Sequence, residues 1–379
     1  MLRRDAKLLA VCFSVWLVMA GTALAQGALV FPVPSTCSTL TGTTSPCTLL
    51  PAATNLPYTT TLSVSGGAQP YTWKLVSGTL PIGMTLNQNT GALFAQNLTS
   101  TGGNTALQIS VTDSNGLTTS ANFILPVYTG LASVARTGVL PQVAFGAGWG
   151  TTIYLNNTTG AVASAQILFR DSNANPMPVP VQSTQPGFSA IASTATTLNF
   201  VIPANATVIV QNTNSSANTL LQGWADVLTT GGVGAFAVFR QSFPAGALPN
   251  VFPNGGFTEG VAQQGQFSAT VTLPYDNTNG VVTAVALASI SNLPPNVTAT
   301  IYDAGGAASP CALPTTLVTL GRVAFTLPDN CPASANTRGY VVFQNMNNVN
   351  GQGALSGLAL NFNSGVFVSF PAIASATQQ

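Results

Sequence analysis

Hydrophobic and polar residues alternate with a period of two along most of the chain. Between Thr105 and Thr112 the hydrophobic positions are 107, 109 and 111, and polar side chains occupy the positions after them. A second run of the same kind covers residues 121–127. This spacing places the hydrophobic side chains on one face of an extended strand. Asn115-Gly116 lies between the two runs, and because both residues tolerate positive φ, we predict a β-hairpin there.

Similar short runs recur along the rest of the chain, separated by Gly, Asn, Asp or Pro. After the N-terminal segment, no run shows the spacing of three to four residues that is typical of an amphipathic helix. Short strands at regular intervals, with turn residues between them, are typical of β-sandwiches. We therefore predict an all-β protein made of three Ig-like antiparallel β-sandwiches in tandem.

A series of short motifs marks the first of these domains. They are PYTW at 70–73, GTLPIGMTLN at 78–87, Thr90-Gly91 and VTDSNG at 111–116. Through these motifs, residues 50–128 resemble the Putative Ig (dystroglycan- and cadherin-like) domains of bacterial surface proteins. The resemblance implies a sandwich fold and an association with adhesion. The family usually has a Ser-Gly-Thr-Pro segment after the Thr-Gly, where this chain has ALFA. We expect the whole first domain, with its N-terminal cysteine segment, to span residues 26–128.

The remainder of the chain contains an internal repeat. Residues 151–171 align without gaps on residues 283–303, so that Asp171 falls on Asp303. LNFVIP at 198–203 also matches VAFTLP at 323–328, and QGWADV at 222–227 matches RGYVVF at 338–343. We expect one sandwich in each copy, repeat 1 at residues 129–253 and repeat 2 at residues 254–379. The two copies resemble paired, uncharacterised β-domains of secreted bacterial proteins, which implies no particular activity.

Residues 1–25 are predicted to be a secretory signal peptide. Arg3, Arg4 and Lys7 precede an uncharged apolar run at 8–20, and Ala23-Leu24-Ala25 supplies small residues for cleavage. The exported chain keeps six basic and seven acidic residues, and so little charge forms no basic patch that could attract nucleic acid. We expect export through the general secretory pathway to the cell surface or the medium, with no transmembrane segment after signal cleavage.

Four cysteines remain after cleavage: Cys37, Cys47, Cys311 and Cys331. An even number of cysteines in an oxidising compartment indicates disulfide bonds. Among the three connectivities that four cysteines allow, we favour Cys37 with Cys47 and Cys311 with Cys331, because each pair lies within one predicted domain. A zinc site would need closely spaced thiolates or histidines, and the chain contains no histidine.

Asp171, Asn173 and Asn175 have the spacing that begins an EF-type calcium loop. In repeat 2 the aligned segment reads YDAGGAA, which keeps the aspartate but replaces both asparagines. The last ligand of such a loop would be Gln182 instead of a glutamate that binds through two oxygens. Asp, Asn and Gly all suit a turn, so we predict a turn and no metal site. Asp113 is the only acid of the first domain, so the acids present do not support the calcium associated with the resembled family, and we expect no cofactor.

Few residues could carry acid–base or nucleophilic chemistry. The lack of histidine excludes Ser-His-Asp, Cys-His and His-Glu metal sites. A carboxylate pair could still hydrolyse glycosides, and the candidates are Asp226, Glu259 and Asp276. Asp276 lies among turn residues, Asp226 follows Trp224 on an expected strand, and Glu259 lies in a Gly-rich connection. We therefore expect no catalytic residues and no enzymatic activity.

Exposed aromatic residues are the better candidates for a binding site, because an indole offers a flat apolar face to a sugar ring. Trp73 and Trp224 lie in expected strands, where a sandwich tryptophan is commonly buried. Trp149, in GAGWGTT, is the one that we expect to be exposed and the candidate ligand-binding aromatic. The sequence favours a secreted, non-enzymatic surface or extracellular-matrix protein that serves in adhesion or as a structural spacer. The alternative is a carbohydrate-binding protein using exposed aromatics. The partner is unknown, and a cell-surface glycan or another surface protein would fit.

Overall fold

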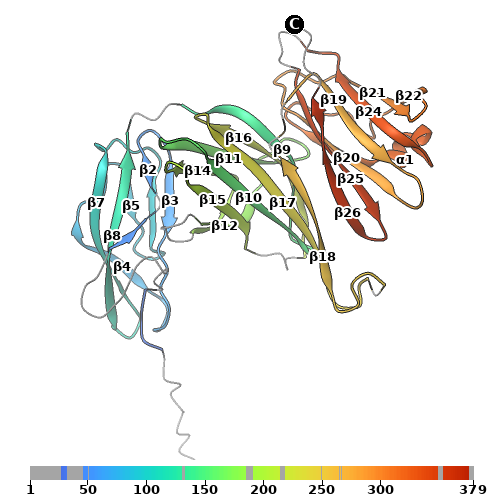
Figure 1. Cartoon of the computed structure of the whole chain (residues 1–379). Coiled ribbons are helices and arrows are strands. Elements are labelled where there is room, and N and C mark those ends of the chain that lie inside the picture. Colours follow the sequence, from blue (N-terminus) through green and yellow to red (C-terminus); the bar gives the residue numbers. More distant parts are fainter. Residues whose placement is uncertain are drawn as a thin grey trace, which may run out of the picture.

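The computed structural model describes residues 27–31, 46–49, 51–129, 133–184, 191–213, 218–248, 250–263, 265, 267–348 and 353–374. The predicted signal peptide and Cys37 lie outside these residues. Within them the regular secondary structure is almost entirely β-strand, with a short helix α1 (Leu327–Asn330) and a 3-10 turn (Pro332–Ser334). Three β-sandwiches follow one another along the chain (Figure 1), which confirms the predicted fold class. No described helix is long and apolar enough to cross a bilayer.

The first sandwich consists of a five-stranded and a three-stranded sheet. The larger has the order β1-β8-β7-β4, with β2 also pairing with β8, and the smaller has the order β3-β6-β5. The short strands β1 and β2 run parallel to β8, and the other pairs are antiparallel. The strands are β1 (Cys47–Thr48), β2 (Ala52–Ala53), β3 (Tyr58–Thr61), β4 (Thr72–Gly78), β5 (Met84–Leu86), β6 (Ala92–Ala95), β7 (Gly103–Thr112) and β8 (Thr118–Tyr128).

The motifs of the first domain pack against one another. The Trp73 side chain is buried, and a Cβ added to Gly91, which has a φ of +71°, would lie 2.6 Å from its ring. Only glycine therefore fits after Thr90. Asp113 Oδ2 accepts the Ala68 N–H at 2.9 Å, next to the PYTW segment. The predicted hairpin at Asn115-Gly116 joins β7 to β8, with Thr112 opposite Thr118. The atypical ALFA segment forms strand β6.

The second sandwich is built from a six-stranded sheet of order β13-β12-β15-β10-β17-β18 and a four-stranded sheet of order β14-β11-β16-β9. β18 lies beyond the boundary that we expected after residue 253, yet it pairs with β17, so this sandwich extends to Gln263. The strands are β9 (Ala135–Phe145), β10 (Trp149–Asn157), β11 (Ala163–Asp171), β12 (Val179–Thr184), β13 (Ile191–Ala195), β14 (Thr197–Ile202), β15 (Thr207–Asn212), β16 (Leu221–Thr229), β17 (Val233–Phe243) and β18 (Gly256–Gln263).

The third sandwich pairs a five-stranded sheet, β22-β21-β24-β19-β27, with a four-stranded sheet, β23-β20-β25-β26. Helix α1 follows β23. The strands are β19 (Thr270–Asp276), β20 (Val282–Ser289), β21 (Val297–Asp303), β22 (Ala308–Cys311), β23 (Arg322–Thr326), β24 (Arg338–Asn345), β25 (Leu355–Asn363), β26 (Val366–Pro371) and β27 (Ile373–Ala374).

The strand order shows how the two repeats correspond. β11-β16-β9 matches β21-β24-β19, and β10-β17-β18 matches β20-β25-β26. Asp171 lies opposite Gly223 in repeat 1, and Asp303 lies opposite Gly339 in repeat 2. A Cβ on Gly223 would lie 2.0 Å from a backbone oxygen of β11, and one on Gly339 would lie 1.9 Å from the Tyr302 oxygen. The same close approach of two strands therefore requires glycine in both copies.

One of the expected matches between the repeats is wrong. LNFVIP forms β14, which pairs with β11, whereas VAFTLP begins in β23, which pairs with β20. The strand that pairs with β10, the counterpart of β20, is β15. β14 and β23 therefore belong to different sheets of the sandwich. Their sequences are similar because both strands direct alternate hydrophobic side chains, such as Phe200 and Phe325, into a core.

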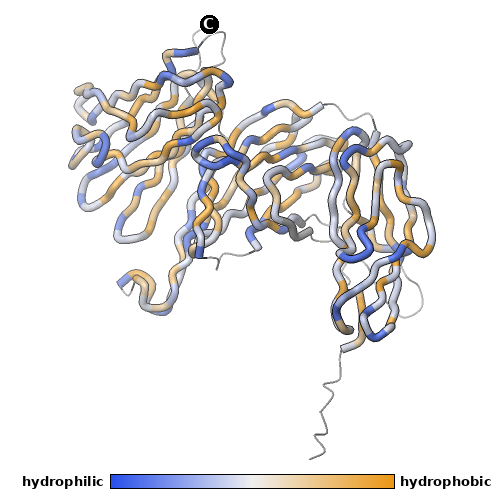
Figure 2. The backbone as a smooth tube through the Cα atoms, turned by 180° about the vertical axis from the view of Figure 1, so that it is seen from behind, coloured by the Kyte–Doolittle hydropathy of each residue, from blue (hydrophilic) through white to orange (hydrophobic). Residues whose placement is uncertain are grey.

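The second and third sandwiches share buried hydrophobic surface. Leu358, Leu360 and Phe367, from β25 and β26, belong to the core cluster of the second sandwich. Ala359, the intervening residue of β25, belongs to the core of the third. β25 is thus buried on both faces. Hydrophobic and hydrophilic stretches are interleaved along the backbone (Figure 2). In β25 the residues of both faces are covered by protein.

Candidate functional site

The junction between the second and third sandwiches carries a buried ion pair. Asp226, on β16, is 1% exposed, and its carboxylate accepts Arg136 Nε at 2.6 Å and Arg136 Nη2 at 3.0 Å. Arg170 Nε lies 3.6 Å from the same carboxylate. Arg136 Nη1 also donates to the Ile290 carbonyl of the third sandwich at 3.1 Å. Trp224 lies beside this network in a hydrophobic cluster with Val139, Ala288, Ile290 and Ala354.

A buried arginine crosses the same junction in the opposite direction. Arg322, at the start of β23, donates through Nε to the Pro141 carbonyl at 3.1 Å and through Nη2 to the Gln142 amide oxygen. Its backbone N–H donates to the Ser172 carbonyl at 2.9 Å. Burial lowers the pKa of Arg322 to about 10, so the guanidinium remains charged at neutral pH. Its charge therefore serves to join the sandwiches.

The three candidate carboxylates lie in different surroundings. Asp226 is in the buried ion pair, away from solvent. Asp276 Oδ1 accepts the N–H of Thr278 at 2.9 Å and its hydroxyl at 2.6 Å, which is a turn, and these bonds lower the pKa of Asp276. Glu259 is on strand β18 and not in a connection, and it pairs with Arg240 at 2.6 Å. Among the residues that the structure describes, no three metal-ligating side chains gather.

The D-x-N-x-N segment of repeat 1 is a turn, as predicted. Asp171 Oδ1 accepts the backbone N–H groups of Asn173 at 2.9 Å and Asn175 at 2.8 Å. Asp303 accepts those of Gly305 at 2.9 Å and Ala307 at 2.8 Å in the same pattern. The aspartate side chains are therefore used to hold the backbone of the turn.

The predicted cysteine pairs fare differently. Cys311 and Cys331 form a disulfide that connects β22 to the end of helix α1. Cys47 begins β1, but Cys37 lies outside the described residues, so the pair Cys37–Cys47 stays a prediction.

The tryptophans follow the predicted order of exposure. Trp73 and Trp224 are buried, at 4% and 0% exposure. Trp149 is half-buried and stacks on Phe367, with ring centroids 5.6 Å apart, and on Phe239 at 6.5 Å. Much of its ring is therefore covered by other aromatic side chains, which leaves less of an open platform than we expected.

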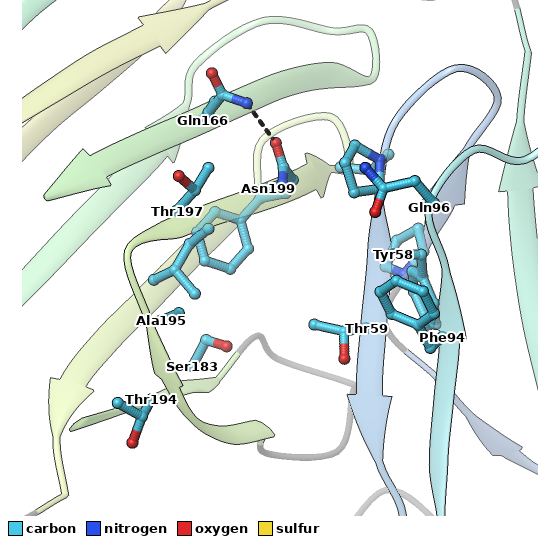
Figure 3. A pocket seen from close by; sticks show the side chains of 15 residues that line it. Tyr58, Thr59, Phe94, Gln96, Gln166, Ser183, Thr194, Ala195, Thr197 and Asn199 are labelled. Carbon is cyan, nitrogen blue, oxygen red and sulfur yellow. Dashed lines mark hydrogen bonds between the residues drawn. The ribbon is translucent and has the colours of Figure 1, made fainter. Parts of the chain in front are cut away.

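A cleft of about 400 Å³ lies between the first and second sandwiches (Figure 3). Tyr58, Thr59, Phe94 and Gln96 come from the first sandwich, and the opposite wall comes from β11, β12, β13 and β14. Gln166 Nε2 donates to Asn199 Oδ1 at 2.7 Å across that wall. Burial raises the pKa of Tyr58, so its hydroxyl stays protonated. The cleft offers neutral amide and hydroxyl groups.

A second hollow of about 400 Å³, here called the sheet groove, lies on the face of the six-stranded sheet that is turned away from the core. Its lining comes from β15, β10, β17 and β18 and includes Thr152, Tyr154, Gln211, Val238, Arg240 and Glu259. The Tyr154 ring stacks on Phe236 at 4.6 Å. The Arg240 guanidinium lies 4.0 Å above the Phe257 ring while it holds Glu259.

Sequence reasoning singled out only Glu259 in this groove, and only as a catalytic candidate. The other polar residues occupy alternate positions of strands, where a polar side chain is normally read as solvent-facing. Arg240 and Glu259 lie opposite each other on β17 and β18. The sequence alone does not give the register of these two strands, so it could not show that the two side chains meet.

Comparisons with known proteins bear mainly on the first domain. No curated protein sequence matches the chain. A SusE-like surface-located polysaccharide-binding protein of Bacteroides thetaiotaomicron is similar over 88% of this chain and 60% of its own length, with 9% identity and a TM-score of 0.19. A protein of the Bacteroides ovatus mixed-linkage glucan utilization locus, solved with a heptasaccharide, is similar over 88% and 99%, with 11% identity and a TM-score of 0.20. These scores support no functional argument.

The family profile described as Putative Ig domain matches residues 26–128. That range contains the PYTW, Thr90-Gly91 and VTDSNG motifs, whose contacts hold the first sandwich together. Residues 26–128 of this chain therefore belong to the Putative Ig domain family.

Proposed function

We propose that this is an exported, non-enzymatic surface or matrix protein, in which tandem sandwiches act as an adhesive or structural spacer. The observation that carries the proposal is the shared core of the second and third sandwiches. A spacer must hold its ends at a fixed separation, and independent domains on a flexible linker do not. Here Leu358, Leu360 and Phe367 complete the neighbouring core, and the partly exposed Arg136 and the buried Arg322 donate across the junction in opposite directions.

Single-molecule force spectroscopy tests this role. If the two sandwiches act as one mechanical unit, they unfold together, in one event that releases the contour length of both repeats. The first sandwich, whose hydrophobic core is separate, unfolds in a separate event. Two independent events of one repeat each would contradict the spacer proposal.

Location supplies an independent test. Fractionation of expressing cells is expected to recover the chain at the cell surface or in the medium, with Gln26 as its N-terminal residue. Recovery in the cytoplasm with an uncleaved leader would contradict export.

Carbohydrate binding is the second candidate function. It is favoured by the two hollows, each of which places aromatic rings beside amide and hydroxyl groups. That combination suits sugars, whose ring faces are apolar and whose edges carry hydroxyls. A glycan array probed with the exported chain tests it: saturable binding would favour this function, and no binding together with surface retention would favour the spacer.

A further inference from the structure

We infer that the sheet groove binds a short, uncharged oligosaccharide. The inference rests on the carbohydrate-binding candidate and assigns it to one place, the outer face of β15, β10, β17 and β18. Three observations carry it: the use of charge in this chain, a comparison of the two repeats, and the chemistry of the lining.

Charged side chains are scarce in this protein, at 4% of residues, and most of the described ones have a structural task. Asp113, Asp171, Asp276 and Asp303 hold turns. Asp329 accepts the Thr326 hydroxyl beside helix α1. Asp226 pairs with Arg136 and Arg170 inside the second sandwich, and Arg136 and Arg322 donate across the junction between the second and third.

The pair Arg240–Glu259 has no such task. Its side chains are 50% and 36% exposed, and both line the sheet groove. An exposed ion pair of this kind adds little to stability. The pair bridges only the neighbouring strands β17 and β18, and it places strong donors and acceptors on an open face.

The repeats provide an internal comparison for the same face. In the gap-free alignment Thr152, Tyr154 and Asn156 of β10 correspond to Ala284, Ala286 and Ala288 of β20. The β20 face is covered by the second sandwich, and Ala286 and Ala288 are buried. The fold thus accepts alanine at these positions, and the larger polar and aromatic side chains of β10 are not needed to build the sheet.

The β17 strand differs from its counterpart in the same way. The register of each strand on its neighbour places Phe236 of β17 at the position of Leu358 of β25, and Arg240 at that of Phe362. Leu358 and Phe362 pack in or against the core cluster of the second sandwich, whereas Arg240 is exposed. Tyrosine and arginine standing on the β10–β17 face would prevent a second sandwich from packing as it does on β20 and β25. A small ligand is a better occupant than another domain.

The lining indicates the class of ligand. Gln211 and Thr152 lie opposite each other on β15 and β10 and can each donate and accept, as sugar hydroxyls do. The Tyr154–Phe236 stack gives an apolar flank for a sugar ring. Because Arg240 is already neutralised by Glu259, the groove has no free cation for a sulfate or uronate. Its volume falls in the range of ordinary ligand sites, about 300–1,000 Å³.

A peptide strand is a poorer fit. Extended peptides usually bind by adding to the edge of a sheet, where backbone groups are unpaired. The groove crosses the inner strands β10 and β17, each of which pairs on both sides.

The test measures binding of the full exported chain to soluble, uncharged oligosaccharides of glucose, xylose, mannose and N-acetylglucosamine by isothermal titration calorimetry. The main variant combines Thr152→Ala with Tyr154→Ala, which installs the residues that repeat 2 already carries. Gln211→Ala changes the other wall. Tyr340→Ala is the matched control, because Tyr340 is 41% exposed and stacks on Tyr302 at 4.9 Å on a different sheet.

We expect at least one uncharged oligosaccharide to bind, with affinity reduced about tenfold or more in the double variant, as for truncation of a central aromatic contact. Gln211→Ala should also weaken binding, and Tyr340→Ala should leave it unchanged. Melting temperatures verify that each variant is folded.

Three other outcomes would overturn the inference. Binding that survives both groove variants would place the sugar elsewhere and leave the carbohydrate-binding candidate standing. Tighter binding of heparin or alginate fragments than of uncharged sugars would contradict the ligand class. No binding of any probe would overturn both the groove and the carbohydrate-binding candidate, and would leave the spacer proposal untouched.

Discussion

Replacing Asp226 by asparagine should destabilise the second sandwich beside its junction with the third. The change keeps the shape of the side chain but removes the negative charge that Arg136 contacts through Nε and Nη2 and that lies near Arg170. Asparagine also presents an NH₂ group, which cannot accept a hydrogen bond. Two arginines would then share a site without an anion.

The expected cost follows from burial. Removing one partner of a buried ion pair destabilises by roughly 3–5 kcal/mol. Asp226 is 1% exposed, but Arg136 and Arg170 are 28% and 20% exposed, so water can solvate them in part. We therefore expect a loss of about 2–4 kcal/mol. For a unit of this size that corresponds to a fall in Tm of roughly 4–16 °C.

Chemical denaturation followed by circular dichroism measures the loss, and Trp224 fluorescence reports on the junction itself. Glu259→Gln is the matched control, because it also removes a carboxylate from an arginine partner, but on the surface. It should cost less than about 1 kcal/mol. Adding Arg136→Met to Asp226→Asn should recover part of the loss, since fewer unpaired charges remain.

A loss below about 0.5 kcal/mol for Asp226→Asn, or one no larger than that of Glu259→Gln, would refute the reasoning. It would mean that water reaches the junction freely. The shared core and the hydrogen bonds of Arg322 would then contribute most of the coupling between the sandwiches.

Three further predictions concern local features. Gly339→Ala should lower the free energy of unfolding by about 1–3 kcal/mol or more, because the added Cβ would meet the Tyr302 oxygen. Gly234→Ala, with open space around its Cβ, is the control. Equal unfolding free energies for the two variants would contradict the prediction. Asp171→Ala should leave calcium-dependent melting unchanged, with curves in calcium and chelator within roughly 1–3 °C; a shift of about 8 °C or more that the variant abolishes would reveal a real site. Hydrogen bonds, first that from Ala68 N–H, hold the pKa of Asp113 below its ordinary 3.8. Its contribution to stability is therefore complete above about pH 4 and lost as the pH falls through the lowered pKa. The Tm of the first sandwich should fall on acidification below about pH 4, less so in Asp113→Asn, and identical pH profiles for the two proteins would argue against this.

Local features could be predicted from the sequence because neighbouring residues determine them. The hairpin at Asn115-Gly116 and the turn at Asp171 both depend on side chains within a few positions. The aligned aspartates and glycines of the two repeats could be found for the same reason. The disulfide Cys311–Cys331 was predicted because both cysteines lie within one predicted domain.

Features that depend on strand register or on other domains could not be predicted in this way. β18 joins the sheet of the preceding repeat, and alternation alone does not say which neighbour a strand chooses. The match of LNFVIP with VAFTLP failed because two alternating hydrophobic strands look alike wherever they lie. One signal was present: β20 lacks polar residues between its hydrophobic ones, which is typical of a strand buried on both faces.

The strand β25 has a consequence for how such a protein can have arisen. A repeat is encoded by one stretch of gene, but here part of the outer surface of repeat 2 is buried against repeat 1. Leu358 and Leu360 complete the core of the preceding sandwich, whereas β18, like its counterpart β26, ends the sheet of its own copy. A single copy therefore no longer covers all of its own hydrophobic surface. If a protease separated the two repeats, each would expose hydrophobic surface that the other now covers. Transfer of a single repeat into another protein would therefore cost stability, which transfer of the pair would avoid.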